Sequence, residues 1–216
     1  MSETTCDFSL GHYRDLLRAA HAGGYRCAGF DRAPHAGDLI LRHDVDLSLD
    51  AAVAVAEVEA EEDAWSTWFL MTRSVFYNLA SKEGERAIAR LRELGHRVAH
   101  HAVWPDVDLD ERFDKVVAWH NPDPEYMKSD IPGAVNVMQA PFFEAGHYRS
   151  DSNQHWRNGC PHAELATGAF EWLQLLTHPE IWAFEGSTMR ESMESMLDAD
   201  RAARFEQLGD DRIDLS

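Results

Sequence analysis

The sequence predicts a single α/β domain built on a parallel β-sheet. Strand-like and helix-like segments alternate at short spacing through the first half of the chain, which is the pattern of repeated βαβ units. The 216 residues, 44% of them hydrophobic, are enough to form one sizeable core. No internal repeat, low-complexity segment or linker divides the chain. Residues 1–216 are therefore expected to form one domain, with a helical tail from about residue 185.

The N-terminal half carries the clearest pattern. Apolar residues follow helical spacing within residues 9–25, and Gly23-Gly24 ends that helix. Ser48 is placed to cap a helix over residues 49–62, and Ser81 and Gly95 are placed as cap and stop of a helix over residues 81–95. The strand-like segments of this half are residues 25–30, 38–45, 66–71 and 96–101.

Beyond residue 105 the pattern weakens. Residues 115–122 are predicted to form a strand that ends at Asn121-Pro122, and residues 134–143 and 147–153 are predicted to be extended. Residues 170–179 begin as helix or strand and end at a proline. The last thirty residues have the pattern of a charged amphipathic helix.

The charge balance limits the classes of partner. With 20 basic and 38 acidic residues, the formal net charge is −18, which repels phosphate backbones and anionic lipid. Nucleic-acid and membrane partners are therefore not expected. The acid excess lies in residues 57–63 and after residue 185, and it is interpreted as solvated helix faces that include Glu59 and Glu61.

Cysteine usage and the N-terminus bear on localisation. Cys6, Cys27 and Cys160 are an odd, sparse set with no CxxC motif, which favours reduced thiols in a cytoplasmic protein. No basic segment followed by an apolar run opens the chain, and no apolar run approaches eighteen residues. Neither a signal peptide nor a membrane-spanning helix is expected.

The stretch "LILRHDVDLS" (39–48) ends an apolar strand in two carboxylates. Asp44 and Asp46 are two residues apart, so both side chains point to the same side of an extended strand end. Two carboxylates in one pocket repel each other unless a cation or a shared proton relieves them. The other reading is that one aspartate caps the following helix while the other is solvated. The spacing alone leaves both readings open.

Histidines follow other predicted strands at their carboxyl ends. His100 and His101 end the strand over residues 96–101, His120 lies in "WHNP", and His178 lies in "LLTHP". In parallel α/β folds ligands gather at the carboxyl ends of strands. Histidine and aspartate at adjacent strand ends match the ligands of a divalent metal ion. Strand alternation turns His100 away from the side that His101 faces.

With these motifs the chain resembles the polysaccharide deacetylase-like (NodB-homology) hydrolases. The resemblance is to the intracellular branch with R-H-D-V-D as first motif, and it covers roughly residues 8–182. The segments that carry it, in family order, are "LRHDVDLSLDAA", "STWFLMTRSVFYN", "LRELGHRVAHH", "WHNP", "YRSDSNQHWRNG" and "LQLLTHPEIW".

The resemblance implies a distorted (β/α) barrel of about seven strands, with a divalent-metal site that hydrolyses an acetamide. Carried over by motif, Asp44 is the expected general base, Asp46 and His101 are expected metal ligands, and His178 is the expected general acid. Zinc fits such ligands, as do manganese, iron, cobalt and nickel.

The third metal ligand departs from the family pattern. Family members have a second histidine four residues after the first, and Pro105 occupies that position here. His120 is the replacement candidate; the alternatives are that it orients another ligand, that it contacts substrate, or that water fills the position. The segment before residue 115 is also too short for the helix that the family has there.

The segment "YRSDSNQHW" (148–156) stands where the family places residues that position substrate. Arg149 and Asp151 share strand parity and are candidates to pair, and Trp156 is a candidate to stack on a sugar ring; the alternative is a polar loop packed over the barrel. The predicted function is N-deacetylation of a small cytoplasmic molecule: an amino sugar, a sugar nucleotide or an acylated intermediate. Two alternatives remain, a barrel that binds a ligand without turnover and an isomerase or lyase using the same metal pocket.

Overall fold

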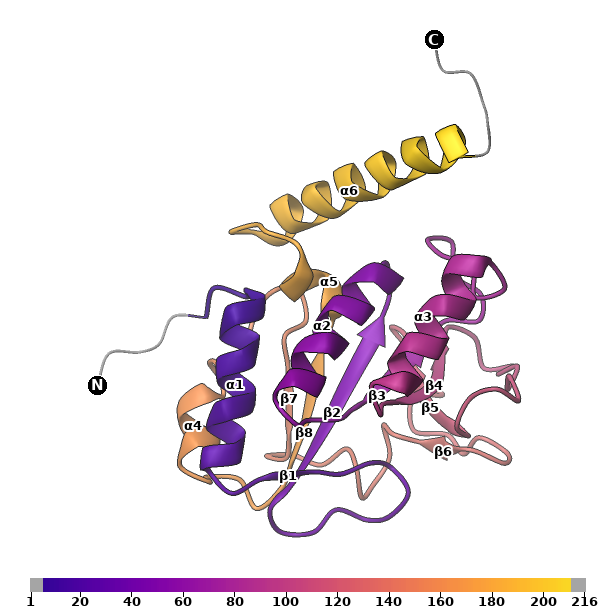
Figure 1. Ribbon diagram of the computed structural model, residues 1–216. Coiled ribbons are helices and arrows are strands. Elements are labelled where there is room, and N and C mark those ends of the chain that lie inside the picture. Colours follow the sequence, from indigo (N-terminus) through magenta and orange to yellow (C-terminus); the bar gives the residue numbers. More distant parts are fainter. Residues whose placement is uncertain (1–5, 211–216) are drawn as a thin grey trace.

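The computed structural model describes residues 6–210 and shows an α/β fold (Figure 1). A curled parallel sheet forms a half-barrel in a single domain, in the order β6-β5-β4-β3-β2-β8-β7, with β1 paired to β2. The predicted fold class is confirmed. The strands are β1 (Arg26–Cys27), β2 (Asp38–Val45), β3 (Thr67–Leu70), β4 (Arg97–Ala102), β5 (Val116–Trp119), β6 (Val135–Asn136), β7 (Tyr148–Ser150) and β8 (Leu173–Thr177).

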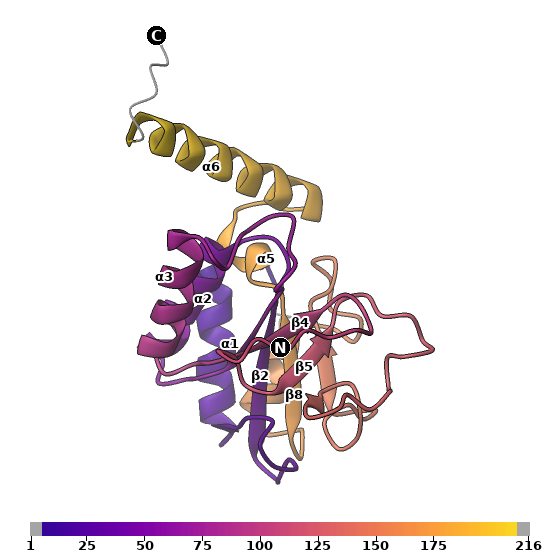
Figure 2. The ribbon, with the colours of Figure 1, turned by 90° about the vertical axis from the view of Figure 1, so that its right-hand side faces the viewer.

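Helices α1 (Leu10–Ala22), α2 (Leu49–Glu61) and α3 (Lys82–Glu93) cover one face of the sheet (Figures 1 and 2). The other helices of the structure are α4 (His162–Ala166), α5 (Pro179–Ala183) and α6 (Met189–Asp210). The covering helices begin at Ser9, Ser48 and Ser81, and each serine hydroxyl accepts a hydrogen bond from the backbone N–H three residues on, at 3.1 Å. The caps predicted at Ser48 and Ser81 are confirmed.

Alternation along β2 divides its side chains between two cores. Leu41 and Val45 pack with the covering helices in the larger cluster, whereas Ile40 packs with Phe69 and Ala99 on the concave side of the sheet. The whole of β2 is buried because neighbours cover both of its faces. Polar groups at the carboxyl end of β2 therefore sit on a rigid, fully supported strand.

The strands β5, β6 and β7 are shorter than the extended segments predicted over residues 115–122, 134–143 and 147–153. No helix joins β4 to β5, in agreement with the short connection in the sequence, and β6 has only two residues. Residues 170–179, left between helix and strand by the sequence, form β8 and the start of α5. Loops fill the side of the half-barrel between β6 and β7.

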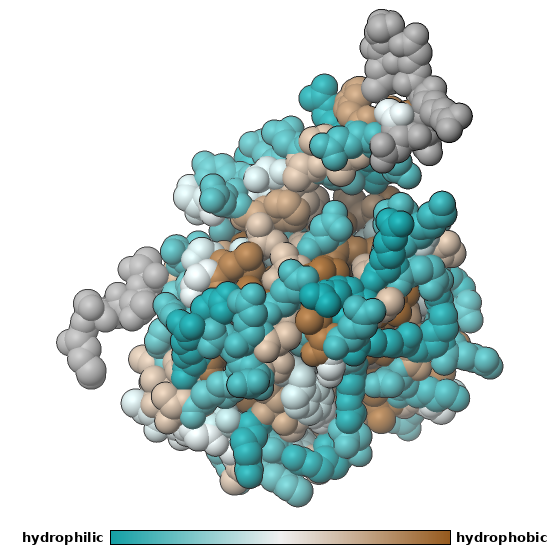
Figure 3. Space-filling model, viewed as in Figure 1, coloured by the Kyte–Doolittle hydropathy of each residue, from teal (hydrophilic) through white to brown (hydrophobic). Residues whose placement is uncertain are grey.

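The tail from about residue 185 is helical, as predicted. Helix α6 extends away from the half-barrel (Figures 1 and 2), and Leu197 and Phe205 on it are 52% and 49% exposed. The space-filling view shows apolar surface where α6 approaches the domain (Figure 3). None of the helices within residues 6–210 has the length and apolar character to cross a membrane.

Glu59 is not the solvated helix residue that the sequence suggested. Its side chain is fully buried beneath α2, where Oε1 accepts a hydrogen bond from the Tyr13 hydroxyl at 2.6 Å and contacts His43 Nε2 at 2.8 Å. Its other oxygen, Oε2, accepts from the Ser66 hydroxyl at 2.5 Å and lies 3.5 Å from His96 Nδ1. The surface interpretation was wrong because helical spacing does not reveal a polar network beneath the helix.

Candidate metal centre

The polar side chains predicted at strand ends meet at one rim of the half-barrel. Asp46 follows β2, His101 lies near the end of β4, and His120 follows β5. Because β2, β3, β4 and β5 pair in parallel, their carboxyl ends lie on the same edge. The β2–β8 register pairs His43 with Thr177, which brings His178 to the same edge beside Asp44.

Asp46, His101 and His120 form a group that could hold a metal ion. Asp46 Oδ1 lies 3.0 Å from His101 Nε2 and 3.1 Å from His120 Nδ1, and the three ligand atoms lie within 4.8 Å of one another. The imidazole rings are nearly perpendicular, at 85°. One carboxylate and two imidazoles in this arrangement suit zinc and other divalent transition metals.

Electrostatics keep Asp46 ready to bind a cation. Burial favours the neutral carboxylic acid, but hydrogen bonds from His101 and His120 outweigh burial and hold the pKa of Asp46 well below its usual range. Burial also opposes protonation of His120, but the hydrogen bond to Asp46 is the larger effect and raises the pKa of His120. The pair is therefore poised to exchange a shared proton for a metal ion.

The two histidines are held differently. His101 Nδ1 lies 3.2 Å from the carbonyl oxygen of Ala118, and a proton on Nδ1 donates to that carbonyl. Nε2, which faces Asp46, is then the ligand atom once a metal ion replaces the proton between them. His120 presents Nδ1, and its Nε2 contacts the side-chain amide of Asn121 at 3.2 Å. Asn121 has a φ of 44°, a left-handed conformation that turns the chain sharply after the histidine.

Asp44 lies beside this group but is engaged by an arginine. Arg42 Nε donates to Asp44 Oδ1 at 2.8 Å, and Nη2 donates to Oδ2 at 2.6 Å, with the arginine fully buried. Burial would raise the pKa of Asp44, but the guanidinium charge and His101 outweigh it and lower the pKa. Asp44 Oδ2 lies 3.7 Å from His101 Nε2, so the ionised carboxylate adjoins the metal-binding group.

Arg42 has a role that was not expected from the sequence. It precedes Asp44 by two residues on β2, so strand alternation puts both side chains on the concave face. Its Nη1 donates to Gln174 Oε1 at 3.3 Å on the neighbouring strand β8. The "RHD" spacing was the signal that could have revealed this pair.

Asp151 fixes the position of His178 through hydrogen bonds to its ring and its backbone N–H. Asp151 Oδ1 lies 2.6 Å from His178 Nδ1, and Oδ2 accepts from the His178 backbone N–H at 3.0 Å and from Trp182 Nε1 at 2.7 Å. Burial disfavours the imidazolium, but the charge of Asp151 and its hydrogen bond, together with the charges of Asp44 and Asp46, outweigh burial and raise the pKa of His178 to about 10. His178 is therefore a proton donor at neutral pH, with its ring fixed by a buried carboxylate.

The predicted partners of the segment over residues 148–156 differ from those in the structure. Asp151 pairs with His178 and not with Arg149, which instead donates to Glu164 Oε1 at 3.4 Å and to the Tyr148 carbonyl at 3.1 Å. Trp156 is 6% exposed and packs in the core. Its ring therefore offers no open face to a sugar, because the β7–α4 connection folds it inward.

Glu180 is a further buried acid near the rim that the sequence analysis did not single out. It is 1% exposed, and burial, the largest effect, raises its pKa to about 8. The charge of His178 lowers the pKa of Glu180, and the charge of Asp46 raises it. The only sequence signal was its position two residues after His178.

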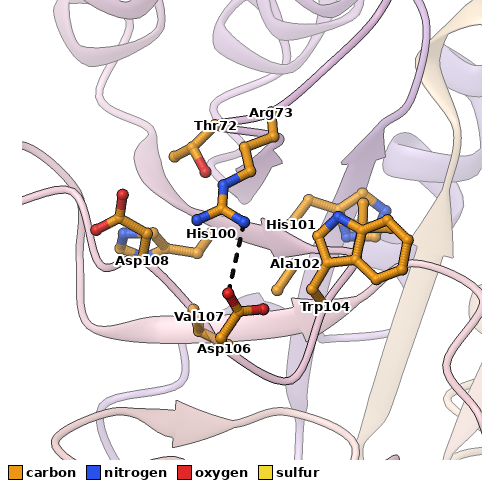
Figure 4. Close-up of a pocket in the computed structure, with 10 residues that line it drawn as sticks. Thr72, Arg73, His100, His101, Ala102, Trp104, Asp106, Val107 and Asp108 are labelled. Carbon is orange, nitrogen blue, oxygen red and sulfur yellow. Dashed lines mark ion pairs between the residues drawn. The ribbon is translucent and has the colours of Figure 1, made fainter.

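The end of β4 and the loops that follow β3 and β4 line a pocket (Figure 4). Arg73 extends from the loop after β3 toward Asp106, with Nη1 and Oδ2 3.7 Å apart. Trp104 is 58% exposed and lines this pocket together with His101. An exposed indole next to a metal-binding group is available for substrate contact.

Comparisons with models of protein families, with curated proteins and with solved structures give no match to this chain.

We expect His101→Ala to weaken divalent-metal binding by more than about 100-fold. Loss of a residue that only hydrogen-bonds to a metal ligand costs up to about 100-fold in affinity, and loss of the ligand itself should cost more. His120→Ala should have the same effect if its Nδ1 is a ligand. The measurement is the number of Zn²⁺ ions retained per chain after dialysis, which should fall by one, followed by titration calorimetry with Zn²⁺. His100→Ala is the matched control, because the His100 ring turns to the Asp114 carbonyl at 3.1 Å. Unchanged metal binding in His101→Ala would remove it from the ligand set.

The His178–Asp151 pair should make stability depend on pH in a defined window. A raised pKa means that the pair stabilises the fold fully below about pH 6.5, the ordinary histidine pKa, and that this contribution is lost as pH rises through about 10. We expect the difference in unfolding free energy between wild type and Asp151→Asn to shrink across that window. Urea unfolding of the metal-free protein from pH 6 to 10 would measure it. Asp200→Asn, which breaks an exposed pair with Arg204, should show a constant difference.

Proposed function

We propose that this chain is a metal-dependent hydrolase that cleaves a C–N amide bond, by N-deacetylation of a small substrate. One observation carries the proposal: a carboxylate held ionised and a histidine held protonated both adjoin one group of metal-binding side chains. Asp44 supplies the ionised carboxylate and His178 the protonated imidazole. The ordered resemblance of the motifs to polysaccharide deacetylase-like hydrolases agrees with this assignment.

The residues fit the chemistry of amide hydrolysis. A divalent cation held by Asp46, His101 and His120 would polarise the amide carbonyl and lower the pKa of a water molecule. Asp44 accepts a proton from the attacking water, and Arg42 fixes the orientation of its carboxylate. His178 donates a proton to the departing nitrogen, and Asp151 holds its ring for that step.

A cavity beside β7 supports a substrate with an anionic group. It has a volume of about 610 Å³, within the usual range for small-molecule sites, and Lys128, Arg149 and Arg157 line it with Glu144 as the one acid. Such a cluster of basic side chains stands out in a chain with a net charge of −18. Tyr148, which also lines the cavity, is close enough to Arg42 and Asp44 for their charges to affect its pKa.

One feature favours a second candidate function, a barrel that binds ligand without turnover. Arg42 engages both oxygens of Asp44, and a carboxylate stabilised in this way is a weaker base. In that case the metal-binding group and the basic cavity hold a ligand, and no bond is cleaved. An isomerase or lyase acting on the same ligand is the third alternative.

The test is product analysis with protein loaded with Zn²⁺ or Mn²⁺. N-Acetylhexosamines, their phosphates and N-acetylated sugar nucleotides are incubated with it, and acetate and free amine are measured. We expect equal amounts of both products, faster formation from the phosphorylated substrates, and none from Asp46→Ala. Ligand binding without acetate release would favour the binding module, and a product that retains its acetyl group would favour the isomerase or lyase.

A further inference from the structure

A second group of metal-binding side chains lies away from the rim, where the N-terminal segment meets the connection to α4. Cys6 precedes α1, His12 lies in the first turn of α1, and Cys160 lies just before α4. Their ligand atoms lie within 4.8 Å of one another, and His12 Nε2 is 3.2 Å from Cys160 Sγ. His12 and Cys160, which are 148 positions apart in the sequence, thus meet at this point.

The donor set has the chemistry of a zinc site. Two thiols and an imidazole are soft and borderline ligands, and Zn²⁺ bound to sulfur at about 2.3 Å and nitrogen at about 2.0 Å places neighbouring ligand atoms within 4 Å. His12 is 6% exposed, and both thiols are partly buried. The three atoms therefore need little movement to surround one ion.

The Cys6 and Cys160 thiols lie side by side in this group. Two thiolates side by side repel each other, and a divalent cation removes that repulsion. Trp156 Nε1 donates to Cys6 Sγ at 3.4 Å, which is the kind of N–H···S contact that supports a metal-bound sulfur.

A fourth ligand is available next to the group. The His162 ring lies 5.6 Å from the His12 ring, centroid to centroid. Its Nδ1 is buried and has no hydrogen-bond partner within residues 6–210. His162 is not among the residues whose ligand atoms already lie within 4.8 Å of one another, so its ring has to turn toward the ion to complete a set of two cysteines and two histidines.

We propose that Cys6, His12 and Cys160, with His162 as fourth ligand, bind a structural zinc ion that fastens the N-terminal segment and α1 to α4. The site adjoins an aromatic cluster that leads to the rim. His12 stacks on Trp182 with an interplanar angle of 11°, and Trp182 donates to Asp151, the residue that holds His178. Zinc at this position therefore stabilises the support of His178.

The test uses the full chain with the rim group disabled by Asp46→Ala and His101→Ala, so that bound metal reports on the second group alone. Loaded with Zn²⁺ under reducing conditions, this variant should retain one zinc ion per chain, and Cys160→Ser added to it should abolish retention. Cys27→Ser is the matched control, because Cys27 lies in β1, outside the group. With Co²⁺ in place of Zn²⁺, the retained ion should give a near-ultraviolet thiolate-to-cobalt charge-transfer band that Cys160→Ser removes.

Thiol reactivity is the second measurement, and it needs no substitution. In the wild type, zinc should protect two of the three cysteines from a thiol reagent, and a chelator should expose them. The proposal is overturned if the rim-disabled variant binds no zinc while circular dichroism shows it folded. It is also overturned if Cys6 and Cys160 form a disulfide under the loading conditions, seen as a mass loss of two hydrogen atoms, or if all three thiols react equally with and without zinc.

Discussion

Asp44→Asn is expected to retain bound metal and to lower turnover by on the order of 10²–10⁴-fold, the usual contribution of a positioned general base. Asparagine keeps the size of the side chain and can still accept a hydrogen bond from Arg42, but it cannot accept a proton at neutral pH. Asp46, His101 and His120 are untouched, so the metal-binding group persists. Metal content and acetate release, measured on the same preparation, test the expectation.

Asp46→Asn is the matched comparison, because it makes the same chemical change two residues away on the same strand end. It should lose metal first and activity as a consequence, with excess metal partly restoring turnover. Asp44→Asn also leaves the buried charge of Arg42 without its counter-ion, so both variants need a thermal unfolding curve at the assay pH. Equal metal loss in both would make both aspartates ligands and move the search for the base to His178.

The sequence predicted the positions of side chains that depend only on the strand to which they belong. Period-2 alternation placed Asp44 and Asp46 on one side of β2, and the rule that parallel strands present their carboxyl ends at one edge brought His101, His120 and His178 to them. These inferences are local, since each needs only the strand and its direction. The parallel sheet followed from the alternation of segments, whereas its curling into a barrel was implied by the resemblance of the motifs alone.

Partners across strands could not be predicted in this way. Asp151 reaches His178 because β7 pairs with β8 in one register, with Ser150 opposite Leu176. The sequence does not contain that register, so Asp151 was paired with Arg149 by parity alone. Trp156 is similar, because the direction of a loop aromatic depends on the neighbours it packs against, here Phe8 and Trp182.

The burial of Glu59 could not be predicted from the spacing of residues along the helix. Glutamate in an alanine-rich helix is usually solvated, and Glu57 and Glu61 on the same helix are exposed. Glu59 differs only in its position on the helix, which aims it at His43 on the outer face of β2. His43 in turn contacts the Thr177 hydroxyl at 2.6 Å, so one network joins α2, β2 and β8 directly behind the rim.

Glu59→Ala is expected to lower the free energy of unfolding by about 3–5 kcal/mol, the range for removing one partner of a buried ionic network. The change leaves the Tyr13 and Ser66 hydroxyls and the His43 imidazole without their buried acceptor. Burial opposes ionisation of Glu59, but its contacts with His43, His96 and Ser66 together outweigh burial and lower the pKa of Glu59. This contribution to stability is therefore present above about pH 4.5 and is lost as pH falls below it. Urea unfolding at pH 7 measures the loss.

Glu61→Ala is the control, because it removes a carboxylate two residues away whose partner is the partly exposed Arg14. An exposed pair of this kind contributes about 0–1 kcal/mol, so the two alanine variants should differ several-fold. Glu59→Gln should fall between them, since its amide oxygen still accepts one hydrogen bond while the negative charge is gone. If Glu59→Ala costs no more than Glu61→Ala, the buried network adds nothing beyond a surface pair. The support of β2 behind Asp44 and Asp46 would then come from apolar packing alone.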